Sequence, residues 1–165
     1  MQALTIFNPW AWAISRGLKL IENRTWVPNW RLLKDGEDLA IHSSVRPPTR
    51  ADFYELARIA RECGRENDLE PASSNAFHPA YGQGRVIAVV RLRGIAHSIA
   101  DVPLEQRPWW RGPKAWLLEE VRQLSIGHLP VVRGQQGLWT LPADVELTTK
   151  NILSMPEGSS WRRTA

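Results

Sequence analysis

A run of ten residues near the start of the chain, GLKLIENRTW at positions 17–26, brings a lysine, a glutamate and an arginine close together. Lys19, Glu22 and Arg24 follow one another at offsets of three and two. Side chains two apart in a strand lie on one face, so Glu22 and Arg24 can line a pocket as a coupled acid and base. A lysine and a carboxylate can also stabilise negative charge and accept a proton in hydrolysis. A solvated strand edge is the alternative that the spacing leaves open.

The chain is rich in tryptophan, with nine in 165 residues. Several stand beside arginine, as in the run WWR at positions 109–111. Proteins hold unpaired bases by stacking them on aromatic rings interleaved with arginine. We expect at least half of the tryptophans in the core. The candidate stacking platforms are Trp10, Trp26 and Trp110.

The net charge of +4 lies entirely in the second half of the chain. Residues 1–82 hold ten basic and ten acidic side chains, whereas residues 83–165 hold eleven and seven. Seventeen of the 21 cations are arginine, whose planar donor group suits phosphates and bases. The isoelectric point near 9.7 agrees with a nucleic-acid partner. The candidate phosphate-binding residues are Arg85, Arg91, Arg93 and Arg111.

The composition excludes several classes of protein. A single cysteine rules out a disulfide framework and a cysteine-built zinc site. There is no glycine-rich phosphate loop, HExxH or GxSxG motif, and the four histidines are scattered, so we expect no metal and no cofactor. No apolar run approaches the roughly 18 residues of a membrane span, and the start lacks the pattern of a signal peptide. We therefore expect a cytoplasmic protein with no membrane contact.

Short strands and helices must position these side chains. Asn8 and Pro9 are expected to cap and open a helix that Gly17 ends. Thr49 and Asp52 predict a capping box at the start of a second helix. The predicted strands are 3–7, 20–26, 39–42, 85–95, 115–124 and 137–141.

These elements predict one α+β domain over residues 1–155, with a barrel-like sheet and short helices inserted between its strands. Residues 156–165 are expected to form a polar tail. The polar stretch 65–84 predicts a long loop, of a kind that often lines or covers a site.

Several segments of the chain resemble the ASCH domain family (activating signal cointegrator homology). They are LTIFNPWA at 4–11, GLKLIENRTW at 17–26, LAIHS at 39–43, GRVIAVV at 84–90, WLL at 116–118 and GQQGLW at 134–139. The resemblance runs over most of residues 3–142. It implies a PUA-like β-barrel with a cleft near the Gly-x-Lys-x-x-Glu-x-Arg segment. It also implies binding of RNA or another single-stranded nucleic acid, in some members through one base held in the cleft.

Two classes of function follow from these residues. The first is a nucleic-acid-binding module, whose ligand-binding residues would be Trp10, Lys19, Glu22, Arg24, Trp26, Trp110 and Arg111. The second is a hydrolase with Lys19 and Glu22 as catalytic residues, since relatives include ribonucleases and N4-acetylcytidine amidohydrolases. Lys19 matches the lysine of those amidohydrolases, but Glu22 stands where they have a threonine. A protein-interaction domain with a vestigial cleft is a third alternative.

Overall fold

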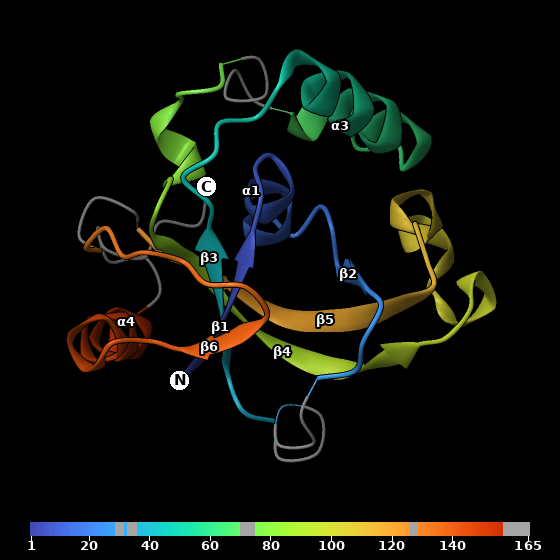
Figure 1. The fold of residues 1–165 in the computed structure, drawn as a ribbon. Coiled ribbons are helices and arrows are strands. Elements are labelled where there is room, and N and C mark those ends of the chain that lie inside the picture. The colour runs from blue at the N-terminus through green and yellow to red at the C-terminus, as the bar shows by residue number, and fades with distance from the viewer. Residues whose placement is uncertain (29–31, 33–35, 70–74, 126–128, 157–165) are drawn as a thin grey trace.

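The computed structural model describes residues 1–28, 32, 36–69, 75–125 and 129–156 (Figure 1). Its strands are β1 (Gln2–Ile6), β2 (Ile21–Arg24), β3 (Leu39–Ser43), β4 (Val86–Ala96), β5 (Lys114–Gln123) and β6 (Leu138–Thr140). Its helices are α1 (Trp10–Ser15), α3 (Arg50–Glu62) and α4 (Ala143–Ser154). Four 3-10 turns within these ranges are η1 (Glu66–Asp68), η3 (Pro79–Tyr81), η4 (Ile99–Asp101) and η5 (Leu104–Trp109).

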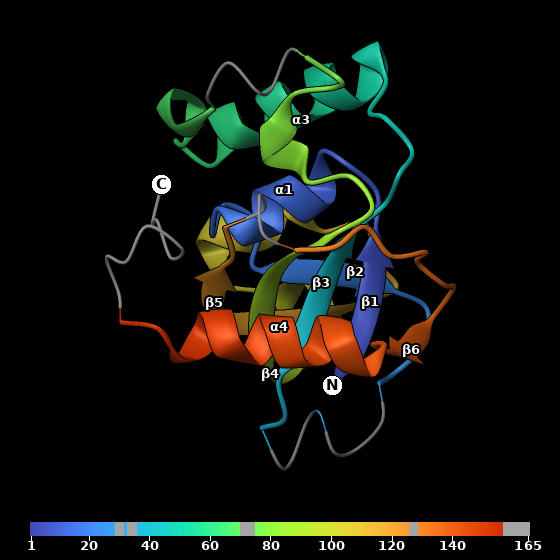
Figure 2. The same cartoon turned by 90° about the vertical axis from the view of Figure 1, so that its left-hand side faces the viewer.

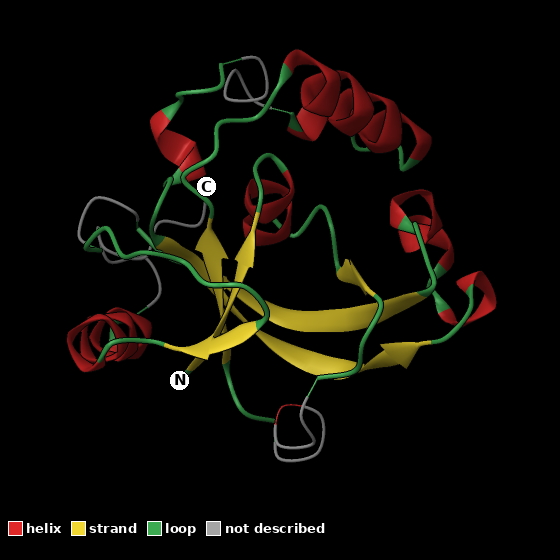
Figure 3. Cartoon of the chain, in the orientation of Figure 1, coloured by secondary structure: helices red, strands yellow, loops and turns green. Residues whose placement is uncertain are grey.

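Within the described residues, the six strands form one mixed sheet in the order β2-β5-β4-β3-β1-β6. β1 pairs in parallel with β3, and the other neighbours pair antiparallel. The sheet curls strongly but stays open between its edges β2 and β6, which makes it a half-barrel (Figure 1). Short helices are inserted between the strands (Figure 3). The predicted α+β fold is therefore confirmed.

The centre of the sheet is buried on both faces. All five residues of β3 are buried, and its three apolar side chains alternate between two clusters. Leu39 and Ile41 pack with Ile14 of α1, whereas Ala40 packs with Val145 of α4. α1 and α4 therefore cover opposite faces, and α3 lies outside α1 (Figure 2). None of the described helices is long and apolar enough to cross a membrane.

Local signals explain how α1 ends and how α3 begins. The capping box is confirmed, since Thr49 Oγ1 accepts a hydrogen bond from the Asp52 amide (3.2 Å) and Asp52 Oδ2 accepts one from the Thr49 amide (2.7 Å). Gly17 follows α1 with a φ of +65°, a left-handed conformation that glycine adopts without steric cost. The end of α1 leads directly to Lys19, and the capping box begins the helix that carries Glu55.

Other expectations differ from the structure. The prediction that Asn8 caps α1 is wrong, because its Nδ2 donates instead to Ser43 Oγ (2.6 Å) and the helix begins after Pro9. β2 is shorter than predicted, and α4 was not predicted at all. The expected loop at 65–84 carries η1 and η3, with Tyr81 buried in the core. Residues 157–165 of the predicted tail lie outside the described residues.

Candidate functional site

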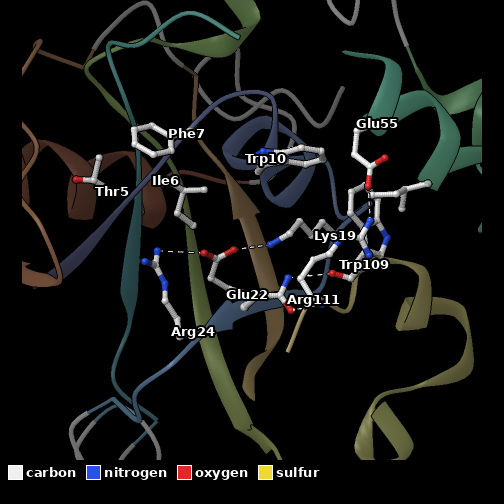
Figure 4. Close-up of a pocket in the computed structure, with 12 residues that line it drawn as sticks. Thr5, Ile6, Phe7, Trp10, Lys19, Glu22, Arg24, Glu55, Trp109 and Arg111 are labelled. Atoms are coloured by element: carbon white, nitrogen blue, oxygen red, sulfur yellow. Dashed lines mark hydrogen bonds and ion pairs between the residues drawn. The ribbon is translucent and has the colours of Figure 1, made fainter. Parts of the chain in front are cut away.

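A cavity of about 340 Å³ lies between the carboxyl end of β1, the start of α1 and β2 (Figure 4). α3 and the segment that follows η5 contribute to its rim. This volume lies in the range of sites for small ligands. We call the cavity the site pocket; its lining residues are Thr5, Ile6, Phe7, Trp10, Lys19, Glu22, Asn23, Arg24, Glu55, Ile59, Trp109 and Arg111.

Three charged side chains form a continuous chain along one side of the site pocket (Figure 4). Lys19 Nζ donates to Glu22 Oε2 and to the carbonyl of Ile21 (2.6 Å). Arg24 Nη2 lies 3.0 Å from Glu22 Oε1. The side chains of Lys19 and Glu22 are only 5% and 10% exposed. Little water screens these charges, so each one depends on its partner for compensation.

The end of α1 positions Lys19. Because Gly17 turns the chain back at this point, the amide of Lys19 donates to the carbonyl of Ala13 (3.1 Å). The next amide, that of Leu20, donates to Oε1 of the buried Gln106 (2.7 Å). The backbone on both sides of the lysine side chain is therefore fixed, and the ammonium group has a defined position.

The alternation of β2 gives the strand two roles. Glu22 and Arg24 lie on one face and contact each other, as their spacing predicts. Asn23 lies on the other face, where its Nδ2 donates to the carbonyl of Trp109 (2.9 Å) and its Oδ1 accepts from the amide of Arg111 (2.9 Å). β2 therefore supplies the charged side of the pocket and also holds the segment that carries Trp109 and Arg111.

Aromatic rings form much of the opposite side. Trp10 and Trp109 pack edge to face, with ring centroids 6.3 Å apart at 83°, an arrangement that aromatic pairs favour. Trp109 is buried, Trp10 is half-buried, and Phe7 is 54% exposed. Phe7 and Trp10 lie across the pocket from Glu22 and Arg24 (Figure 4). A flat ligand in the pocket would therefore contact rings on one side and charges on the other.

An ion pair between Glu55 of α3 and Arg111 adds to the rim. Arg58 also donates twice to the Glu55 carboxylate, at 2.8 and 2.9 Å. Hydrogen bonds from Arg58 and then Arg111 lower the pKa of Glu55 to about 2, so it stays ionised at neutral pH. The pocket lining then holds three cations and two carboxylates, an excess of one positive charge.

A series of hydrogen bonds through the lining residue Thr5 lies at one end of the pocket. Trp139 Nε1 donates to Thr5 Oγ1 (3.1 Å), and the Thr5 hydroxyl pairs with His42 Nδ1 (3.3 Å). His42 Nε2 lies 3.0 Å from the carbonyl of Val132, to which it donates. Burial lowers the pKa of His42, which favours the neutral ring, and the Val132 carbonyl holds the ring proton on Nε2. The Thr5 hydroxyl then donates to Nδ1.

No family model matches the chain, and no curated protein matches it. The solved structures that are similar to it include two of one Zymomonas mobilis protein. The crystal structure of ASCH from Zymomonas mobilis is 15% identical, with a TM-score of 0.47 over 91% of this chain and 93% of that one. A mutant of the same Zymomonas mobilis protein is 16% identical, with a TM-score of 0.45 over 93% and 94%. Both are ASCH proteins, the family that the sequence resembles.

The structure brings five of the predicted ligand-binding residues together in the site pocket: Trp10, Lys19, Glu22, Arg24 and Arg111. Two predicted platforms do not line it. Trp26 packs edge-on against Trp116, with centroids 4.7 Å apart, and its carbonyl accepts from Trp116 Nε1 (3.1 Å). Trp110 is half-buried against the cluster between α1 and α3. Both rings therefore serve packing in this structure.

The three other arginines predicted to hold phosphates lie away from the site pocket. Arg85 Nε donates to the carbonyl of Leu129 (3.0 Å). Arg91 forms an ion pair with Asp38 (3.4 Å) at the opposite end of the sheet. Arg93 is exposed on β4. The charge pattern located these cations in the second half of the chain but could not place them in space.

Sequence reasoning missed seven of the lining residues: Thr5, Ile6, Phe7, Asn23, Glu55, Ile59 and Trp109. The sequence could have indicated Trp109, because it belongs to the run WWR from which the neighbouring Trp110 was chosen as a stacking platform. Glu55 and Ile59 lie four apart on α3, and only the tertiary fold brings that face to the pocket. In the part of the chain that the structure describes, no group of three or more metal-ligating side chains could hold a metal ion.

Proposed function

We propose that the protein binds RNA and holds one unpaired base in the site pocket. The observation that carries the proposal is the chain of the buried Lys19 and Glu22 with the half-buried Arg24, which faces aromatic rings within one cavity. Proteins recognise an unpaired base by stacking its faces on rings and bonding its edge with polar groups. The site pocket offers both kinds of surface.

The charged chain has unused capacity to bond the edge of a base. An ionised carboxylate has about four acceptor sites, and Lys19 and Arg24 occupy two on Glu22, so an exocyclic amine can still donate to it. Lys19 uses two of its three donors. Nε of Arg24 is buried without a hydrogen-bond partner in the described part of the chain. Because a buried unpaired donor costs about 1–3 kcal/mol, a ligand oxygen that reached it would bind favourably.

The charge of the pocket supports a single strand as the ligand. Its excess of one positive charge favours a phosphate beside the bound base. A base within a duplex is stacked and paired, so it cannot enter a cavity of this kind without leaving the helix. The proposal therefore concerns unpaired RNA.

Quenching of tryptophan fluorescence by short single-stranded RNA, at low and high salt, tests the proposal. Arg24→Ala should weaken binding by about 1–3 kcal/mol. Arg93→Ala, which removes an exposed arginine outside the pocket, is the matched control and should change the binding free energy by less than about 0.5 kcal/mol. The absence of salt-sensitive quenching, or equal losses in both variants, would contradict the proposal. Equal affinity for DNA of the same sequence would broaden the ligand to single strands in general.

A hydrolase is the second candidate, because Lys19 and Glu22 are in direct contact inside the site pocket. Glu22 would take a proton from the attacking water, and Lys19 would stabilise the negative charge that develops. Gel analysis of the same RNA tests for a ribonuclease, and chromatography of N4-acetylcytidine tests for an amidohydrolase. Turnover that Glu22→Gln abolishes would favour this candidate, whereas intact substrates would leave the binding module.

A further inference from the structure

Two exposed aromatic rings, one in the pocket lining and one on α3, each have an arginine over them. Phe7 is 54% exposed, and the guanidinium carbon of Arg46 lies 5.2 Å from its ring centroid. Tyr54 is 62% exposed, and the guanidinium carbon of Arg50 lies 5.3 Å from its centroid. Arg50 Nε also donates to the Tyr54 hydroxyl (3.0 Å). Large apolar surface left exposed in this way often marks a binding surface.

One pair includes a residue of the pocket lining, and the other lies on the helix that carries one. Phe7 is itself a lining residue, and Tyr54 precedes the lining residue Glu55 on α3. Phe7 and Glu55 lie on the same side of the pocket, across from Glu22 (Figure 4). Arg46 lies on the segment between β3 and α3, four residues before Arg50. Arg46, Arg50 and Tyr54 therefore lie on one short stretch of chain that leads to Glu55 on the pocket rim.

The arginines of these pairs differ from three arginines farther along the chain. No carboxylate in the described part of the chain lies within ion-pair distance of Arg46 or Arg50. In contrast, Arg58, Arg61 and Arg65 each pair with a nearby carboxylate. An arginine without a carboxylate partner remains available to a phosphate, and the part of the ring that the arginine leaves exposed remains available to a base. The two kinds of group that bind single strands therefore occur together here.

We propose that the Phe7–Arg46 and Tyr54–Arg50 pairs form a stacking track for the nucleotides that flank the base in the pocket. The inference rests on the proposed RNA binding and specifies its substrate class, which is a single-stranded oligonucleotide rather than a free nucleoside or nucleotide. Each ring stacks one flanking base, and each arginine contacts a phosphate of the strand.

The test compares ribonucleoside monophosphates with pentaribonucleotides of each base, by fluorescence titration of the full chain. Tyr54 is the decisive position, because it lies outside the pocket lining. Tyr54→Leu should lower pentanucleotide affinity about tenfold and change mononucleotide affinity by less than about twofold. Phe77→Leu removes another ring, 74% exposed and outside the pocket, and should have no effect. Arg50→Gln should reduce the dependence of log K on log salt by about 0.7, the value for one phosphate contact in a single strand.

The outcomes separate this inference from the function on which it rests. If the wild type binds mononucleotides and pentanucleotides equally and Arg24→Ala weakens both, base binding in the pocket is supported and the stacking track is wrong. If Tyr54→Leu and Phe77→Leu have the same pentanucleotide affinity, the track is also wrong. If wild type binds neither ligand, the proposed function fails and the track fails with it. Tenfold weaker pentanucleotide binding in Tyr54→Leu alone supports the track.

Discussion

Two cavities of the same volume, about 340 Å³ each, lie near opposite ends of β1. The second is lined, among the described residues, by Met1, Gln2, Gly36, Glu37, Asp38, Arg91, Glu146 and Lys150. None of these described residues is aromatic. Its side-chain ion pairs are partly exposed, as in Asp38 with Arg91 and Glu146 with Lys150, and only the Met1 amino group is nearly inaccessible. The site pocket has aromatic rings and, in Lys19 and Glu22, an ion pair that is nearly inaccessible to water. The two cavities have the same volume but differ in how far water is excluded from their charges. Exposed ion pairs contribute little free energy, so charges shielded from water discriminate more strongly between ligands.

Removing the central carboxylate of each cavity would test this difference most strongly. Glu22→Ala leaves the buried ammonium of Lys19 without its partner, so we expect a loss of about 3–5 kcal/mol in the free energy of unfolding. Asp38→Ala removes a carboxylate that is 26% exposed, and should cost less than about 1 kcal/mol. Urea denaturation measures both values. Equal losses would show that burial does not distinguish the two cavities.

The two ends should also respond to acid in different pH ranges. Burial lowers the pKa of His42, whose Nδ1 pairs with the Thr5 hydroxyl at the site pocket, below its ordinary value of 6.5. The unfolded chain then binds the proton more readily, so this contribution to stability is complete above pH 6.5 and is lost as the pH falls toward the folded pKa. For Asp38, burial alone would raise the pKa, but Arg122 and Arg91 lower it, so its contribution is lost only below 3.8.

Urea unfolding midpoints between about pH 8 and pH 5 separate these contributions. The midpoint of the wild type should decrease with acid over this range, and that of His42→Gln should decrease less. Asp38→Asn serves as the control and should keep the wild-type slope. If His42→Gln and the wild type have the same slope, His42 is not the group responsible.

The smallest effect is expected at the rim. Glu55→Gln removes one of the two carboxylates of the site pocket and raises its positive excess from one to two charges. RNA affinity should rise by less than about tenfold, and stability should change by less than about 1 kcal/mol, because Glu55 is 36% exposed. Glu66→Gln removes a carboxylate that pairs with Arg61 away from the pocket, and should raise affinity less. Equal gains in the two variants would mean that only the overall charge matters.

The sequence predicted the charged side of the pocket well, because that side depends on local rules. The period of two in a strand placed Glu22 and Arg24 on one face, and Gly17 marked the helix end that positions Lys19. The capping box predicted where α3 begins. Each of these signals spans only a few residues, so local spacing was sufficient.

The opposite side could not be predicted in the same way, because distant segments form it. Phe7 and Ile59 belong to elements about fifty residues apart, and no local pattern relates them. Trp109 and Trp110 are adjacent, so composition could not decide which ring would face the cavity. Arg85 and Arg91 both contribute to the positive charge of the second half of the chain. Arg91 lies on β4 and Arg85 directly precedes it, and both contact other partners away from the pocket. The number of charged residues in a segment does not specify where their side chains lie in the folded protein.

Asn23 has a consequence for how a ligand would be received. Its carboxamide connects β2 to the segment of Trp109 and Arg111 by two hydrogen bonds of 2.9 Å, while the neighbouring residues of β2 form the charged side. The two sides of the cavity are therefore preorganised by one strand and keep their separation when it is empty. A ligand entering such a site immobilises few protein groups, so little conformational entropy is lost on association. A few contacts can then support useful affinity, and discrimination between ligands rests on shape rather than on closure.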